Sequence, residues 1–141
     1  MADPTWTEIA DALADAIAGG TYKGKSIDSQ VLGGSGRIDA PCVRITPPRI
    51  GFDAFGESWR VDSSEWPVLI YTSEGGTPNL DEDMAFVEAM LDALDTDPTL
   101  GGLVQQVSPV LVEAPQPVTS SGPRGRDRQL LQRVATLRMD H

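Results

Sequence analysis

The chain has very few of the residues on which most enzyme active sites depend. Its one histidine, His141, is the last residue of the sequence, where we expect it to lie in solvent. Its one cysteine, Cys42, stands in an apolar run and is expected to be a small core residue. Without an interior histidine we expect no Ser–His or Cys–His catalytic pair. A single cysteine also excludes an intramolecular disulfide and a zinc site built on cysteines.

Signatures of nucleotide binding and of membrane insertion are missing as well. The glycine-rich stretches LGGSG (32–36) and SEGG (73–76) lack the lysine and the strand-to-helix context that phosphate binding requires, so we expect turns. No run of eighteen apolar residues occurs, and the first residues have no basic, then apolar, secretory pattern. The sequence therefore predicts a cytosolic protein that is not an enzyme, with no cofactor, no metal and no membrane contact.

Charge of one sign is plentiful and unevenly distributed. The net charge is -10, and eight acids with no base lie between Glu74 and Asp97. Five arginines stand against one acid between Arg124 and Arg138. These stretches are either a solvated helix face and a basic loop, or two complementary surfaces that meet between subunits. The basic stretch is short and carries no aromatic residues, so sequence-specific nucleic-acid binding is not expected.

Two amphipathic helices are predicted. The first starts with Asp3 as N-cap and Pro4 at the first helical position, and a left-handed stop at Gly19-Gly20 should end it. The second starts at Asn79 as N-cap and ends before Pro98. Its buried stripe is expected at Leu80, Met84, Val87, Leu91 and Leu94, widened by Phe86 and Met90. Its off-stripe acids should face water or a partner: Asp83, Glu88, Asp92 and Asp95.

Four strands are expected, at 37–48, 66–73, 103–114 and 129–139. With the helices they predict an α+β two-layer sandwich, in which a four-stranded, mostly antiparallel sheet carries both helices on one face. Hydrophobic residues make up 40% of the 141 residues, which is enough for one domain spanning 1–141. Long loop arms are expected at about 47–65, as a loop or irregular hairpin, and at 114–128.

The stretch ALDTDPTLGGLVQQV (93–107) has three interpretations. Asp95 and Asp97 suggest a metal site, the glycine pair suggests a phosphate cradle, and Pro98 suggests a corner between helix and strand. A hard cation needs six or more oxygens, and no further carboxylate follows until Glu113. We therefore expect a corner in which Leu100 packs under the sheet and the glycines adopt backbone angles closed to other residues. Leu103 and Val104 should then begin the third strand.

The order of these stretches is similar to a known group of proteins. An amphipathic helix leads to APCVRITPP, then WPVLIYTSEGG runs into the second helix, and D-x-D-P-T-L-G-G is followed by LVQQV and QLLQRVATLRM. The chain resembles the tail terminator and head–tail joining proteins of long-tailed bacteriophages, a group that includes neck and tail-completion proteins. The resemblance implies a structural virion protein without catalytic residues, assembled in the host cytoplasm.

The resemblance also implies partners. Such a protein forms a ring, commonly a hexamer, that caps the tail tube, contacts the major tail tube protein and joins it to the head connector or stopper, while DNA passes through the lumen without specific binding. Our candidate interface residues are Phe52, Phe55, Trp59, Glu88, Asp92, Arg124, Arg126 and Arg128. Alternatively, Phe52 and Trp59 cover one end of their own core and the arginines are solvated.

Two other functions stay open at this point. One is a different neck protein, such as a connector or stopper. The other is a small cytosolic hydrolase or ligand-binding domain that uses the carboxylates of 81–97 in a concave pocket.

Overall fold

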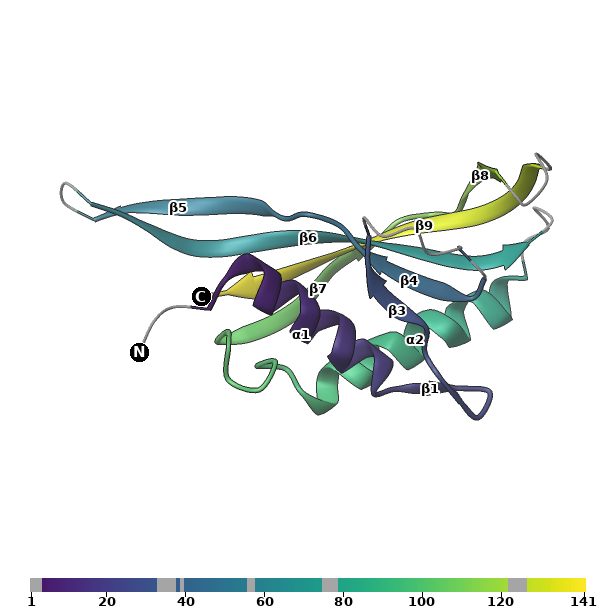
Figure 1. Cartoon of the computed structure of the whole chain (residues 1–141), viewed down its shortest axis with the longest axis horizontal. Coiled ribbons are helices and arrows are strands. Elements are labelled where there is room, and N and C mark those ends of the chain that lie inside the picture. The colour runs from purple at the N-terminus through teal and green to yellow at the C-terminus, as the bar shows by residue number, and fades with distance from the viewer. Residues whose placement is uncertain (1–3, 33–37, 39, 56–57, 75–78, 122–126) are drawn as a thin grey trace.

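The computed structural model describes residues 4–32, 38, 40–55, 58–74, 79–121 and 127–141, and the side chains of 53–60, 73–78 and 120–128 lie outside this description (Figure 1). Two helices and nine strands follow one another in these ranges. They are α1 (Trp6–Ala18), β1 (Thr21–Tyr22), β2 (Lys25–Ser26), β3 (Ser29–Val31), β4 (Cys42–Ile45), β5 (Arg49–Phe55), β6 (Ser58–Glu74), α2 (Leu80–Thr96), β7 (Gln106–Val112), β8 (Gln116–Ser121) and β9 (Asp127–Asp140).

The main sheet is built around two long antiparallel strands, β6 and β9. Strands β4 and β5 pair in succession along the outer side of β6, and β7 and β8 do the same along β9. The short strand β3 adds to β4 in parallel, and β1 and β2 form a separate two-stranded ribbon. The fold is therefore α+β with a mostly antiparallel sheet, as predicted.

The predicted strand count of four is wrong, because the described sheet has seven strands. The predicted strands end at residues 48 and 114, but Pro47-Pro48 lies in a short break between β4 and β5, and Pro115 lies in one between β7 and β8. The two strands on either side of each break run along the same neighbour. Within the expected loop at 114–128, residues 116–121 form β8 and residues 127–128 begin β9, while residues 122–126 lie outside the described residues. Proline is tolerated in β8 because edge strands need no donor on their outer side.

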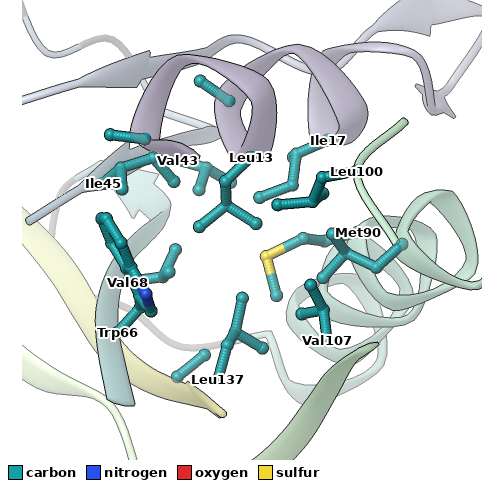
Figure 2. Close-up of a cluster of buried hydrophobic side chains, with 14 of the residues drawn as sticks. Leu13, Ile17, Val43, Ile45, Trp66, Val68, Met90, Leu100, Val107 and Leu137 are labelled. Atoms are coloured by element: carbon teal, nitrogen blue, oxygen red, sulfur yellow. The ribbon is translucent and has the colours of Figure 1, made fainter. Parts of the chain in front are cut away.

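Both helices pack on one face of the sheet, as predicted (Figure 1). Figure 2 shows Leu13 and Ile17 of α1 and Met90 of α2 pointing toward side chains from the sheet. Alternate residues of β4, β6 and β9 reach this core, among them Val43, Trp66, Val68 and Leu137. The opposite face carries a smaller cluster of Cys42, Tyr71 and Leu130, so the expectation of a buried Cys42 is confirmed.

The start of α1 differs from the prediction. Thr5 is the N-cap, and its Oγ1 accepts a hydrogen bond from Glu8 N at 3.1 Å. Pro4 thus precedes the cap, and Asp3 lies outside the described residues. The predicted cap of α2 is confirmed, because Asn79 Oδ1 accepts from Glu82 N at 3.3 Å.

The glycine pair after α1 does not form the predicted left-handed stop. Gly19 has φ -70°, and Gly20 is not among the residues with positive φ. A Cβ atom on Gly20 would lie only 2.6 Å from the Cβ of Ala93 in α2. Glycine is therefore required for the close approach of the two helices.

We expect Gly20→Ala to lower the free energy of unfolding by about 1–3 kcal/mol, the usual cost of overpacking a core. Neither Cβ can move without moving its backbone, so the helices must separate slightly. Urea denaturation measures the loss. Adding Ala93→Gly removes the opposing Cβ but also costs stability by placing a glycine in α2. The loss in the double variant should therefore be smaller than the sum of the losses in the two single variants. A double variant less stable than the sum of the two single effects would contradict this explanation.

The corner after α2 is confirmed. Leu100, Gly101 and Gly102 have φ of 50°, 69° and 91°, and Leu100 is buried in the core. The carboxylate of Asp97 accepts a hydrogen bond from Gly101 N at 2.9 Å, so it stabilises the turn. The prediction that residues 103 and 104 begin a strand is wrong, because β7 starts at Gln106.

The buried stripe of α2 is rotated from the predicted one. Leu80, expected in the core, is 66% exposed, whereas Asp83, expected at the surface, is 2% exposed. The buried positions are Asp83, Phe86, Val87, Met90, Ala93 and Leu94. Asp83 therefore occupies a helical spacing typical of core residues, four positions before Val87.

Candidate subunit interface

A two-stranded arm extends past both helices at one end of the molecule (Figure 1). It consists of β5 and residues 58–62 of β6, which pair with β5 alone because β9 joins β6 only from Ser63 onward. Four residue pairs, from Phe52↔Val61 to Phe55↔Ser58, lie beyond that point. At about 3.3 Å per residue they reach about 13 Å further. A hairpin without a third strand or a helix is marginally stable in water, which favours a binding partner for this arm.

The described part of the arm presents apolar side chains to solvent. Phe52 is 58% exposed and Ile50 is 37% exposed. The alternative that Phe52 covers its own core is therefore wrong. Phe55 and Trp59 lie in the arm, where the register pairs Trp59 with Ala54, but their side chains are outside the description. Phe52 is thus the predicted interface aromatic whose exposure the structure establishes.

The charged candidates are distributed over two other elements. Glu88 and Asp92 are exposed one turn apart on α2, as predicted. Arg124 and Arg126 lie outside the described residues, and Arg128 pairs with Ser120 at the start of β9. One acid and one arginine of the two charged stretches meet inside the chain: Arg133 Nη2 lies 4.0 Å from Asp83 Oδ2, and both side chains are buried. The prediction that Asp83 faces water or a partner is therefore wrong.

The carboxylates do not converge on a metal site. A depression of about 510 Å³ beside the end of α1 is lined by Asp15, Asp92 and Asp97 among other residues. Within the ranges that the structure describes, no three acidic, histidine or cysteine side chains are grouped closely enough to hold a metal ion. Neither described helix combines the length and hydropathy needed to cross a membrane.

His141 is the residue whose position differs most from the sequence-based expectation. It is half-buried, its ring makes an edge-on contact with Trp6 at 5.5 Å, and its backbone N–H donates to Asp62. Its Nε2 lies 2.7 Å from Ser64 Oγ, which also accepts a hydrogen bond from Trp66 Nε1 at 2.8 Å. The expectation that His141 lies in solvent is therefore wrong.

This serine–histidine pair has the geometry of a structural contact. Ser64 is 1% exposed, so its hydroxyl is closed to a substrate. Ser64 Oγ accepts from Trp66 Nε1, and its contact with His141 Nε2 is a hydrogen bond whose direction depends on the imidazole tautomer. The chain of hydrogen bonds anchors the end of β9 next to the base of the arm.

Acid should weaken this anchor. Burial lowers the pKa of His141 below its usual 6.5, while the nearby Asp140 and Asp62 raise it. Below about pH 6.5 the unfolded chain therefore binds more protons than the folded chain, and the free energy of unfolding should fall as the pH drops toward the lower folded pKa. Urea midpoints at about pH 7.5 and about pH 5.5 measure this change. His141→Gln, which cannot titrate, should show a smaller drop, and an equal drop would contradict the assignment.

Comparisons of the chain with protein-family models and with curated proteins returned no match.

The sequence gave no indication of the exposed apolar pair Val110 and Leu111 on the edge strand β7. The bulge between Pro109 and Leu111 interrupts the alternation of buried and exposed residues along β7, so the sequence pattern does not show which residues are exposed.

Proposed function

We propose that this chain is a structural virion protein, a tail terminator that forms a ring, caps the tail tube of a long-tailed bacteriophage and joins it to the head connector. The observation that carries the proposal is the projecting arm with its exposed Phe52. An arm of this kind is a poor element for a monomer and a suitable one for contacting a neighbour.

A closed ring requires two different patches on each subunit, because its contacts are heterologous. The arm at one end of the molecule supplies one patch, and the body supplies the other (Figure 1). The acidic surface of α2, with Glu88 and Asp92 exposed, complements the arginine-rich 124–128 stretch in charge. A net charge of -10 also suits a lumen through which DNA slides, because stable DNA binding depends on basic groups.

Light scattering and electron micrographs of the purified protein test the proposal. We expect one discrete oligomer, which the resemblance implies to be a hexamer, that appears as rings in projection. A protein that stays monomeric over a wide concentration range and leaves tail tubes unbound would rule the proposal out. A connector or stopper, the alternative position in the neck, would form rings that bind the head portal in preference to the tube.

A further inference from the structure

An open pocket lies beside the β1–β2 ribbon. Its volume is about 580 Å³, within the usual range of binding pockets. The β1–β2 ribbon, the end of β6 and the first turns of α2 surround it. Its apolar walls include Tyr22, Ile27, Pro41 and Phe86. We call it the aromatic pocket.

The aromatic walls are fixed in place. The rings of Tyr22 and Phe86 meet edge to face with centroids 5.2 Å apart, and the Tyr22 hydroxyl donates to the backbone oxygen of Glu82. Phe86 is 2% exposed, so its ring is held by the core. On the inner wall, the buried Thr72 Oγ1 has no hydrogen-bond partner among the described residues. A pre-formed aromatic pocket of this kind favours a planar apolar side chain as its occupant.

Two lysines and two acids line the rim of the pocket, and Lys25 is the one of the four for which the described structure shows no ion pair. Glu82 is paired with Lys23 at 3.6 Å, and Asp28 is paired with Arg44 at 3.3 Å. Lys25 is exposed at the same rim and adds a cation to these pairs. An acidic partner is therefore favoured.

The arm has the complementary properties. Phe52 is its most exposed described apolar residue, and the sequence of 52–62 holds three acids, Asp53, Glu57 and Asp62, against Arg60. In Figure 1 the arm projects at the left, whereas β1 lies below the sheet toward the right, so an arm cannot reach the pocket of its own chain. Repeating a contact between two different patches gives a head-to-tail series that closes into a ring when the rotation allows it.

We propose that the aromatic pocket receives the arm of a second copy of this chain, with Phe52 as the inserted side chain. This inference deepens the proposed function and shares with it the requirement that the chain associates with itself. The ring of Phe52 packs against Tyr22 and Phe86, and Lys25 faces the acidic arm. Each subunit then gives its arm to one neighbour and takes the arm of the other.

Disulfide cross-linking tests the contact directly. The double variant Phe52→Cys, Ser26→Cys places one thiol on the arm and one on the pocket wall, since Ser26 is exposed and lines the pocket. Mild oxidation should give a ladder of dimers, trimers and larger species on a denaturing gel. Each single variant, with the same buried Cys42, should stop at the dimer at most. An absent ladder in a double variant that still forms oligomers would overturn the proposal.

Two further variants measure how much the contact contributes. Phe52→Ala removes the inserted ring and Ser26→Trp fills the pocket, and each should weaken self-association at least about tenfold. Leu111→Ala and Gln105→Trp are matched controls on exposed positions away from the pocket, and both should associate like the wild type. Circular dichroism melts should show that all four variants are folded. Unchanged association of Phe52→Ala would contradict the inference.

The outcomes separate this inference from the proposed function. Rings that persist in Phe52→Ala and Ser26→Trp would overturn arm docking and leave the tail terminator proposal standing. If self-association depends on both residues but the protein does not bind tail tubes, the result would support docking and overturn the proposal of a tail terminator. If both variants form normal rings but lose tube binding, the pocket's occupant is a segment of the tube protein, and docking between copies is wrong.

Discussion

Replacing Asp83 with alanine should lower the free energy of unfolding by about 3–5 kcal/mol, because it leaves the charge of Arg133 buried without a counter-charge. Asp83 is 2% exposed and Arg133 is 6% exposed. The two charged groups approach to 4.0 Å, while Asp83 Oδ2 and Arg133 Nε have no hydrogen-bond partner in the described structure. The pair therefore offsets its desolvation mainly by attraction across a short distance, and either half alone is strongly unfavourable. The midpoint of urea denaturation measures the loss.

The same helix provides the control for this prediction. Asp81→Ala also removes an acid from the first turn of α2, but Asp81 is exposed, so only the small interaction with the helix dipole is lost. The double variant Asp83→Leu, Arg133→Met, which replaces both charges with apolar groups, should be more stable than Asp83→Ala. Equal losses in Asp83→Ala and Asp81→Ala would contradict a buried ion pair.

Shortening the arm should abolish ring formation while leaving the body folded. Replacing residues 53–60 with Asn-Gly makes Phe52↔Val61, an existing pair of the register, the last pair of a two-residue hairpin. No pairing between β6 and β9 is removed, because that pairing starts at Ser63. We expect association to weaken at least about a hundredfold, since the arm loses about 10 Å of reach. Analytical ultracentrifugation measures the change.

The melting temperature of the shortened chain is the necessary companion measurement. A variant that melts within a few degrees of the wild type and sediments as a monomer would support the arm as an assembly element. A variant that melts normally and still forms complete rings would show that the contacts between subunits lie elsewhere, such as on the charged surfaces of α2 and the 124–128 stretch.

The sequence predicted the elements whose patterns are local. The amphipathic first helix, the Asn79 cap, the strand at 66–73 and the corner at Gly101-Gly102 are all properties of neighbouring residues, and each is present. The strand count was wrong because proline marks a break in a strand as readily as its end. A proline marks a break when the segments before and after it pair with the same neighbouring strand. That pairing depends on residues far away in the sequence.

The candidate site was less predictable. The contact between Ser64 and His141 joins residues 77 positions apart, and no local pattern indicates it. Asp83 stands at a helical spacing typical of the core, but an acid there is expected at the surface unless its partner is known. The exposure of Phe52 follows from the length of β6 beyond β9, which depends on register. These features result from tertiary pairing, and sequence patterns do not encode them directly.

The most direct test of the central claim is electron microscopy of the purified protein mixed with tail tubes of a long-tailed phage. We expect ring-shaped density at one end of each tube, and no such density with the shortened-arm variant. Tubes with bare ends at saturating concentrations of a folded wild-type protein would contradict the claim that this chain is a tail terminator.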